Sequence, residues 1–188
     1  MKVSKTDLPG ILLISPPVFS DARGFFAETW HQIRYHEIGL PENFVQDNLS
    51  YSKGGVLRGL HFQYPQAQGK LVSVLHGEVF DVAVDIRVGS PTFGRWIGMV
   101  LSGENRCQVY IPEGFAHGFC VTSEYAVVVY KCTDFYNSQT EGGILWNDPD
   151  IGIDWPVRTP LLSEKDRSLL SLKSLPLDRL PTYNPSAL

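Results

Sequence analysis

The sequence of 188 residues has no long hydrophobic run. Its first apolar stretch, residues 11–14, is shorter than the roughly 7–15 residues at the centre of a secretory signal. No stretch approaches the ~20 apolar residues that a helix needs to cross a bilayer. The sequence therefore predicts neither a secretory signal nor a membrane-spanning segment.

Cysteine is scarce. The three cysteines, Cys107, Cys120 and Cys132, are odd in number, show no Cys-x-x-Cys spacing and lie in apolar, strand-like segments. Such residues are typical of a reduced core rather than of a disulfide or a metal site. We therefore expect a cytoplasmic protein.

Neither sign of charge is in large excess. The chain has 16 Lys and Arg against 20 Asp and Glu, a net charge of -4, and both signs are mixed along its length. This pattern does not fit a nucleic-acid-binding protein or the polybasic patch of a membrane-surface protein. The sequence also has no repeat, low-complexity block or linker, so we expect one domain over residues 1–188.

Short β-rich segments separated by glycine, proline and polar turns fill much of the chain, as is typical of a sandwich or barrel. In residues 78–88 the even-numbered positions share one face and the odd-numbered positions the other, which predicts a strand. His76 and Gly77 form a tight turn before it. Residues 125–130 are apolar on both faces, which predicts a central, buried strand. The other predicted strands are residues 70–75, 96–101, 107–111, 115–121 and 125–132.

Few helices are expected. Residues 28–38 are one candidate, and Ser163 is placed to cap a second, whose acidic first turn would stabilise the helix dipole. The tail, from about residue 168 to residue 188, has scattered leucine and proline and no clear period. We expect it to wrap along the body of the protein or along a partner subunit.

The segment at residues 58–63, Arg-Gly-Leu-His-Phe-Gln, is the sharpest candidate for chemistry. Regular strand alternation would place Arg58 and His61 on opposite faces. They can serve one site only if the strand departs from regular pleating, and Gly59 is the position where a bulge would occur. Taken alone, a histidine such as His61 is more often a hydrogen-bonded core residue than a catalyst.

The segment at residues 112–119 has the Pro-x-Gly-x-x-His spacing of the second cupin motif, with His117 at the position that ligates metal in metal-binding cupins. The first cupin motif requires a His-x-His pair, and here His61 is followed by Phe62 and Gln63. Catalytic metal ions need three or four converging ligands. His61 and His117, with Glu78 as an uncertain third, fall short, so no metal site is predicted.

Other polar residues have an ordinary structural explanation when taken singly. Residues 21–28 and 46–50 fit surface loops, and Glu141 also lies in a loop. Tyr130 ends the predicted buried strand, where a tyrosine usually packs with its hydroxyl bonded to a partner. Asp166 fits the first turn of a helix. A chemical role for these residues can be inferred only when the segments are considered together.

In combination, these segments resemble the dTDP-4-dehydrorhamnose 3,5-epimerase family, from about residue 7 to residue 166. No single motif is decisive, but the ordered set is specific. The motifs are D-x-R-G-x-F, Q-x-N, R-G-L-H-F-Q, G-E-V-F-D-V-A-V-D-I-R, S-P-T-F-G-x-W, I-P-E-G-F-A-H-G-F, Y-K-C-T-D-F-Y, W-N-D-P and S-E-K-D.

The resemblance implies a mostly β, cupin-type jelly-roll barrel with a few short helices, no metal or other cofactor, and a homodimer. The substrate it implies is dTDP-4-dehydro-6-deoxy-D-glucose, inverted at C3 and C5 on the way to dTDP-L-rhamnose. His61 resembles the family's general base, Asp166 the acid that orients it, and Tyr130 the general acid. The positions that bind substrate are Arg23, Glu28, Gln46, Asn48, Arg58, Lys70, His117, Glu141 and Lys165, with Asp47 between two of them.

These residue types suit proton transfer beside a ketone. Removing a proton next to the C4 ketone gives an enolate, and reprotonation from the opposite face inverts the carbon. Imidazole titrates near working pH, and Lys70 or another cation near the oxygen would stabilise the enolate. Arg23 and Arg58 suit the diphosphate. Phe25 and Tyr136 would cover the sugar or the thymine.

Three alternatives stay open on the sequence. The chain could be a mono-epimerase that inverts only C3 or only C5 of a related sugar. It could be a metal-dependent cupin such as an oxygenase. It could also bind a sugar nucleotide without catalysis, although binding alone does not need His61, Tyr130 and Asp166 together.

Overall fold

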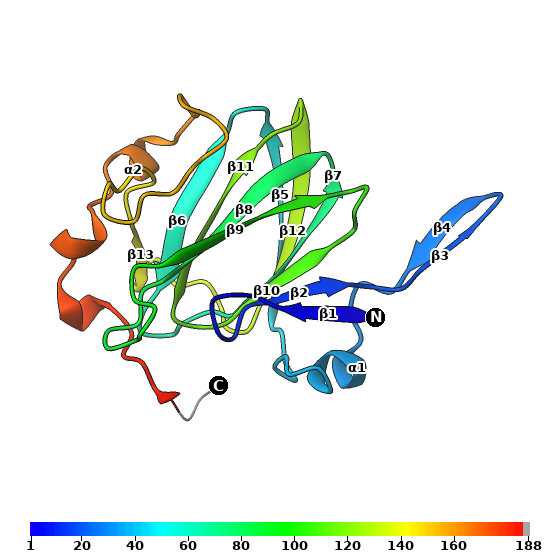
Figure 1. Cartoon of the computed structure of the whole chain (residues 1–188), viewed down its shortest axis with the longest axis horizontal. Coiled ribbons are helices and arrows are strands. Elements are labelled where there is room, and N and C mark those ends of the chain that lie inside the picture. Colours follow the sequence, from blue (N-terminus) through cyan, green and yellow to red (C-terminus); the bar gives the residue numbers. More distant parts are fainter. Residues whose placement is uncertain (186–188) are drawn as a thin grey trace.

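The computed structural model describes residues 1–185, and its body is built from two antiparallel β-sheets that lie face to face (Figure 1). The six-stranded sheet has the order β1 (Lys2–Lys5), β2 (Leu12–Ser15), β10 (Gln108–Ile111), β7 (Lys70–His76), β12 (Tyr125–Cys132) and β5 (Gln46–Lys53). The five-stranded sheet has the order β13 (Glu141–Gly143), β6 (Leu57–Gln63), β11 (Phe115–Val121), β8 (Glu78–Asp85) and β9 (Trp96–Ser102). The predicted mostly β jelly roll is confirmed.

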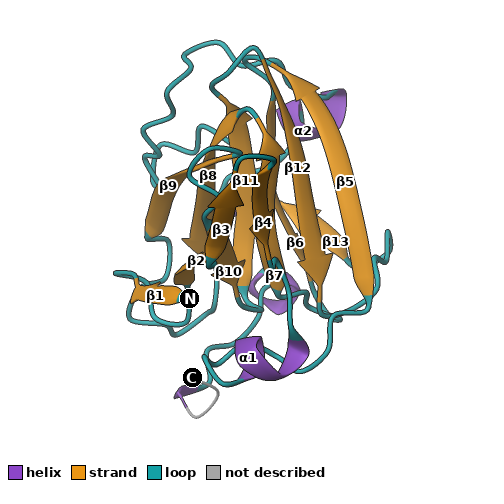
Figure 2. Cartoon of the chain, turned by 90° about the vertical axis from the view of Figure 1, so that its right-hand side faces the viewer, coloured by secondary structure: helices purple, strands orange, loops and turns teal. Residues whose placement is uncertain are grey.

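A separate hairpin, β3 (Val18–Asp21) and β4 (Gly24–Ala27), extends away from both sheets (Figure 1). The helices are short: α1 (Gln32–His36), α2 (Glu164–Arg167) and the 3₁₀ turns η1 (Leu172–Ser174) and η2 (Leu177–Arg179). Helices α1 and α2 lie at opposite ends of the body (Figure 2). The body therefore has a projecting arm and a different short helix at each end.

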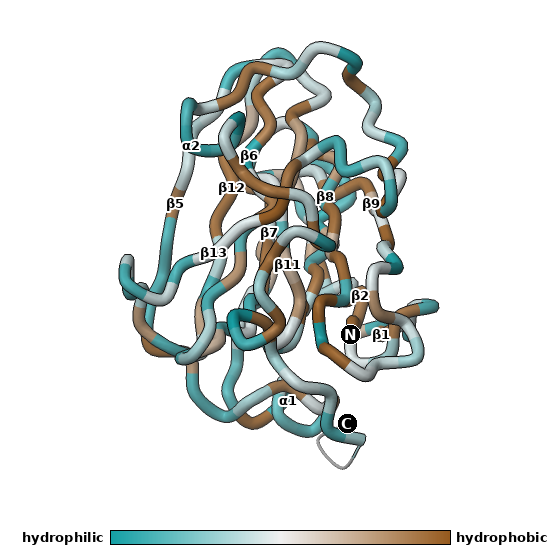
Figure 3. The backbone as a smooth tube through the Cα atoms, turned by 90° about the vertical axis from the view of Figure 1, so that its left-hand side faces the viewer, coloured by the Kyte–Doolittle hydropathy of each residue, from teal (hydrophilic) through white to brown (hydrophobic). Residues whose placement is uncertain are grey.

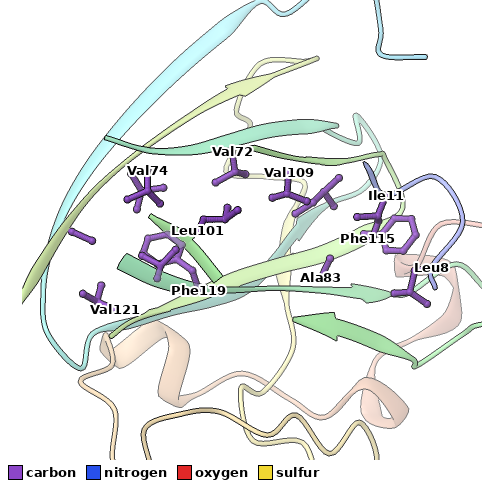
Figure 4. Packing of buried hydrophobic residues seen from close by; sticks show 14 residues of the cluster. Leu8, Ile11, Val72, Val74, Ala83, Leu101, Val109, Phe115, Phe119 and Val121 are labelled. Carbon is purple, nitrogen blue, oxygen red and sulfur yellow. The ribbon is translucent and has the colours of Figure 1, made fainter. Parts of the chain in front are cut away.

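The main core lies between the two sheets (Figure 4). It contains Val72 and Val128 from the six-stranded sheet and Leu101 and Phe119 from the five-stranded sheet, all buried. Each such side chain contributes about 1.5–3 kcal/mol through removal of apolar surface from water. Along the chain, many of the hydrophobic segments fall in the strands (Figure 3). The inner faces of the sheets thus supply the stability against which a polar site can be held.

Strand β8 has the two faces that the sequence predicts. Val79 and Ala83 belong to the core between the sheets, whereas Val82, Val84 and Ile86 pack on the other face in a second cluster. That second cluster also contains Trp155, Leu172 and Leu180. The described part of the tail therefore wraps along the body, as expected, and residues 186–188 of the predicted tail lie outside the described residues.

The turn at His76 and Gly77 passes the chain from the six-stranded sheet to the five-stranded sheet, because β7 and β8 belong to different sheets. Gly77 has φ 75°, and a Cβ atom there would lie 2.0 Å from the Tyr125 carbonyl oxygen. Only glycine fits both the left-handed backbone and this close approach. The predicted tight turn is present, and it joins the two sheets.

The first predicted helix is shorter in the structure than the sequence indicates. Of the helix expected over residues 28–38, only α1 is present. His31 caps it by accepting the Arg34 N–H, and Gly39, at φ 96°, follows its end. Five residues do not form a stable helix alone. Buried Tyr35 anchors this one by donating its hydroxyl to Gln108 at 2.7 Å. By contrast, the predicted cap Ser163 begins α2 as expected, accepting the Asp166 N–H at 3.1 Å.

Strand β12 is buried on one face only, so the prediction of burial on both faces is wrong. Ala126 and Val128 are buried, while Val127 and Val129 alternate with them and stay partly exposed. They share the outer side of the six-stranded sheet with three exposed residues of neighbouring strands. We call this set the outer apolar face: Leu49, Tyr51, Leu75, Val127 and Val129.

Candidate active site

A bulge in β6 builds one wall of the site. His61 pairs with His117 of β11 and Arg58 pairs with Phe119, so three steps of β6 oppose two steps of β11. Gly59 lies between them with φ 123°, and a Cβ atom there would lie 2.6 Å from Gly118 Cα. Because of this irregularity, Arg58 and His61 both line one cavity of about 430 Å³. The predicted departure from pleating at Gly59 is present.

His61 forms a hydrogen-bonded pair with Asp166. Its Nε2 atom lies 2.6 Å from Asp166 Oδ1, and the carboxylate is 5% exposed against 29% for the imidazole. Burial raises the pKa of Asp166, but the hydrogen bond from His61 and the positive charge of Lys165 outweigh it and hold that pKa below its ordinary value. An ionised Asp166 accepts the Nε2 proton, which leaves Nδ1 of a neutral His61 as the nitrogen able to accept a proton.

The other sheet supplies Tyr130 from β12 and Lys70 from β7, and both line the same cavity as His61. Burial raises the pKa of the Tyr130 phenol, so it keeps its proton at neutral pH. Burial lowers the pKa of Lys70, while the carboxylates of Asp81 and Glu141 act in the opposite direction. An imidazole from one sheet and a phenol from the other thus share one cavity.

A second histidine–carboxylate pair lies beside the first. His117 Nε2 is 3.0 and 2.9 Å from the two oxygens of Asp81, and both side chains are buried. Asp81 was not among the residues predicted for the site. The pattern that would have revealed it is a carboxylate on the same face of β8 as Val79 and Ala83, which are core residues.

A smaller cavity of about 200 Å³ adjoins the larger one, because His61, Lys70 and Tyr130 line both. Tyr136 donates its hydroxyl to Glu141 at 2.8 Å, and Lys165 pairs with the same carboxylate oxygen at 2.5 Å. Burial raises the pKa of Glu141, but these two partners lower it further than burial raises it. The smaller cavity therefore has a carboxylate held in its ionised form by two partners and an exposed aromatic ring at its edge.

The chain matches the model of the family described as dTDP-4-dehydrorhamnose 3,5-epimerase over residues 5–174. The chain belongs to this family. The family that the ordered motifs predict is therefore confirmed, and it is a family of isomerases.

Individual relatives agree with this assignment. A dTDP-4-dehydrorhamnose 3,5-epimerase of Neisseria gonorrhoeae is 59% identical over 167 residues, which are 88% of this chain and 51% of that protein. A Shigella flexneri protein of the same name is 58% identical over 168 residues, 88% of this chain and 93% of that protein. The chain thus spans about half of the first relative and nearly all of the second.

The fold agrees as well. The crystal structure of a dTDP-6-deoxy-D-glucose-3,5-epimerase from Legionella pneumophila superimposes with a TM-score of 0.95 at 51% identity, covering 97% of this chain and 98% of that one. That structure is a complex with dTDP-4-keto-L-rhamnose. A cupin-type jelly roll is thus the shared framework of this epimerase family.

Eleven of the fifteen predicted site residues line the two cavities. The larger cavity has Arg58, His61, Lys70, His117, Tyr130, Lys165 and Asp166, and the smaller one adds Gln46, Asn48, Tyr136 and Glu141. They come from both sheets, from the loop after β12 and from α2. The fold therefore brings together most of the positions that the resemblance to the epimerases selects.

The remaining four lie elsewhere. Arg23 is paired with Asp21 at the tip of the projecting hairpin, and its side chain is 90% exposed. Phe25 lies on the same hairpin, with the Arg106 guanidinium 4.1 Å from its ring centre. Glu28 pairs with Arg34, and Asp47 pairs with Lys131 at 2.9 Å. Within a single chain these four residues are separate from the cavity of His61.

Among residues 1–185, no group of three or more His, Cys, Asp or Glu side chains is placed to hold a metal ion. No helix in that part of the chain is both long and apolar enough to cross a membrane. Cys107, Cys120 and Cys132 are free thiols.

Proposed function

We propose that the chain inverts C3 and C5 of dTDP-4-dehydro-6-deoxy-D-glucose, giving dTDP-4-dehydro-L-rhamnose, by proton transfer between His61, Tyr130 and the sugar. The observation that carries this proposal is that His61, paired with Asp166, and Tyr130 line one cavity from different sheets. Membership of the 3,5-epimerase family supports the substrate class.

The first step is removal of a proton beside the C4 ketone. His61 accepts it at Nδ1, and the electrons of the C–H bond move into an enolate whose charge lies on the C4 oxygen. Asp166 stabilises the imidazolium that forms, as the carboxylate of other His–Asp pairs does. Because Asp166 is nearly buried and ionised, it also fixes which nitrogen of His61 carries the proton before the reaction.

The second step is reprotonation from the other face. Tyr130 donates its phenolic proton to the carbon, and the C–H bond re-forms with inverted configuration as the enolate returns to a ketone. His61 then releases its proton to solvent and the Tyr130 phenolate regains one. The raised pKa of Tyr130 makes the phenol the resting form, so the donor is ready for each cycle.

The cations of the cavity bind the charged parts of the substrate. Lys70 lies near the reacting groups and stabilises the enolate oxygen, where a preorganised positive charge lowers the barrier most. Arg58 suits the diphosphate because a planar guanidinium can bond two oxygens. Tyr136, half exposed at the edge of the smaller cavity, is the platform for the thymine ring.

The test is deuterium incorporation. The pure protein is incubated with dTDP-4-dehydro-6-deoxy-D-glucose in heavy water, and C3 and C5 are followed by NMR. Deuterium and inversion at both carbons are expected. Inversion at one carbon would make the chain a mono-epimerase, and bound substrate without exchange would make it a binding module. Stoichiometric iron in the active protein would favour the metal-dependent alternative.

We also propose that the active form is a homodimer. The outer apolar face of the six-stranded sheet and the exposed Phe19, Phe25 and Phe26 of the hairpin present apolar surface that a second copy would cover. In such a dimer, the hairpin of one copy is the segment able to carry Arg23, Phe25 and Glu28 to the cavity of the other. This would give these three predicted residues their role in substrate binding.

Subunit complementation tests the shared site. Arg23→Ala and His61→Ala are each expected to be nearly inactive alone. Co-expressed in equal amounts, they form mixed dimers with one intact site, so about a quarter of all sites regain activity. Mixtures that stay inactive, although mixed dimers are shown to form, would contradict a shared site. A monomer in sedimentation measurements that is fully active would contradict the dimer.

The compartment is a further part of this proposal. We infer a cytoplasmic enzyme, because all three cysteines are free and two of them, Cys120 and Cys132, are buried. Burial raises the pKa of both thiols, which keeps them protonated and unreactive. Cell fractionation with an antibody to the protein tests this location.

A further inference from the structure

Gln63 is a buried side chain at the end of β6 that the proposed chemistry does not use. Its amide nitrogen donates to the backbone carbonyls of Gln66, at 2.5 Å, and Phe135, at 3.0 Å. Its amide oxygen accepts the backbone N–H of Asn137 at 2.8 Å. One side chain thus joins β6 to the loop between β12 and β13.

These contacts fall on both sides of Tyr136. Gln63 bonds the carbonyl of the residue before it and the N–H of the residue after it. The N–H of Tyr136 itself donates to Gln46 of β5 at 2.8 Å. The backbone around Tyr136 is therefore held by glutamines from both sheets, Gln63 from the five-stranded sheet and Gln46 from the six-stranded sheet.

The ring of Tyr136 is exposed in spite of this restraint. It is 54% exposed and lies at the edge of the smaller cavity, with its hydroxyl donated to Glu141. An exposed loop aromatic normally loses conformational freedom when a ligand stacks on it, which weakens binding. Here the loop is already ordered by bonds from the body of the protein, so a planar ligand meets a ring in a fixed position.

We propose that Gln63 is a positioning residue, which fixes the ring of Tyr136 as a platform for the nucleobase of the substrate. This inference rests on the nucleobase role proposed above for Tyr136. A glutamine is suited to the task because it offers two N–H donors and one acceptor on a planar group. Glutamate has the same shape but no donors, and methionine has a similar length with neither donors nor a strong acceptor.

The experiment measures binding of dTDP and of inorganic pyrophosphate by calorimetry. The variants are Gln63→Glu, Gln63→Met and Tyr136→Ala, with Gln139→Glu as a matched control. Gln139 lies on the same loop and is exposed, and its backbone N–H donates to the side chain of Asn137. Thermal melting and circular dichroism establish that each variant is folded. Gln63→Met removes the hydrogen bonds without adding charge, so comparison with Gln63→Glu separates the loss of hydrogen bonds from the added negative charge.

We expect Tyr136→Ala to weaken dTDP binding about 5- to 150-fold, the range of aromatic–base stacking. Both Gln63 variants are expected to weaken dTDP binding by about fivefold or more, since the same platform is displaced but not removed. For the two Gln63 variants, pyrophosphate binding and kcat at saturating substrate are expected to stay close to wild type. The Gln139→Glu control is expected to bind both ligands normally.

The double variant Gln63→Met/Tyr136→Ala decides between positioning and general stability. If Gln63 acts through Tyr136, its substitution has no further effect on dTDP binding once the ring is gone. Additive losses, or an equal loss of pyrophosphate binding in Gln63→Met, would overturn the inference. Normal dTDP binding by Tyr136→Ala would instead refute the nucleobase role and the inference with it. Normal binding by both folded Gln63 variants would refute the inference alone.

Discussion

The two histidine–carboxylate pairs of the cavity make the same contact in different surroundings. His61 is 29% exposed and bonds Asp166, which is separated from it by 105 residues and lies on the short helix α2. His117 is 8% exposed and bonds Asp81 on β8, the strand next to its own in the same sheet. One pair joins a sheet to the C-terminal segment, and the other is enclosed within a sheet.

This difference separates a reactive group from a fixed one. A general base must reach the substrate and later exchange its proton with solvent, which partial exposure allows. A side chain that only binds a fixed part of the substrate works best when its neighbours hold it rigidly. We therefore propose that His61 removes the proton and that His117 binds the substrate, and variants of the two residues can be compared directly.

The largest effect is expected for His61→Ala. Loss of the base should lower kcat by about 100- to 10,000-fold. His117→Ala removes a binding contact instead, so KM should rise with kcat much less affected. Steady-state kinetics with wild-type protein as the reference makes the comparison. Near-normal turnover by folded His61→Ala would remove the base assignment, and equal losses in kcat for both variants would remove the distinction between them.

Tyr130→Phe tests the opposite wall of the cavity. The substitution removes only the hydroxyl, so inversion should fall by about 100-fold or more, within the range of general acid catalysis. Deprotonation by His61 is retained, and substrate hydrogen should still exchange with deuterium from the solvent. NMR in heavy water reads both rates in one sample. Inversion at the wild-type rate would show that another group donates the proton.

The carboxylates give a smaller difference. Asp166→Asn keeps the shape of the pair but cannot stabilise an imidazolium, so kcat should fall by about 10- to 100-fold, the value of a hydrogen bond to a charged group. Asp81→Asn should change kcat less, because its histidine does not take up the proton. Asp166 also contributes to stability, since its pKa is lowered by folding below 3.8.

The sign of that contribution can be checked by thermal melting. A carboxylate whose folded pKa is lowered stabilises the protein above its unfolded pKa, and the contribution is lost as pH falls through the folded pKa. Wild type should therefore be more stable than Asp166→Asn at neutral pH, with the difference shrinking below about pH 4. A difference that is constant down to pH 2 would contradict an ionised Asp166 in the folded state.

Local rules predicted the parts of the site that depend on local sequence. The cap at Ser163 and the bulge at Gly59 follow from residue type and spacing, and both are present. The pairing of Asp81 with His117 depends on the register between β8 and β11, which no short segment specifies. The same is true of Gln63, two of whose partners, Phe135 and Asn137, lie in a loop 72 and 74 residues later.

The half-exposed strand β12 shows a different limit. Val127 and Val129 have the apolar character of core residues, but they lie on the outer apolar face. A surface that a second copy covers and a surface that the same chain covers have similar composition. The hairpin residues Arg23 and Phe25 pose the related problem that the family pattern selects them while the single chain keeps them from the cavity.

The smallest effect at neutral pH is expected for Lys70→Arg, because this substitution keeps the positive charge. The pH dependence of Lys70 also separates Asp81 from Asp166 most directly. Burial lowers the pKa of Lys70 from its ordinary value of 10.5, and the charge of Asp81 opposes this shift. If Lys70 stabilises the enolate oxygen, kcat/KM should fall as pH rises through this lowered pKa, because the cation is lost. Lys70→Arg keeps its charge and should move the alkaline fall to higher pH. Asp81→Asn should move it to lower pH by removing a favourable negative charge, whereas Asp166→Asn should leave it in place, because Asp166 pairs with His61.

The pH dependence of kcat/KM for the four proteins measures these shifts. The alkaline fall should not come from Tyr130, whose pKa is raised above 10.0. An alkaline fall at the same pH in wild type and Lys70→Arg would show that another group titrates, and equal shifts for both Asn variants would show that the two carboxylates act on the cavity alike.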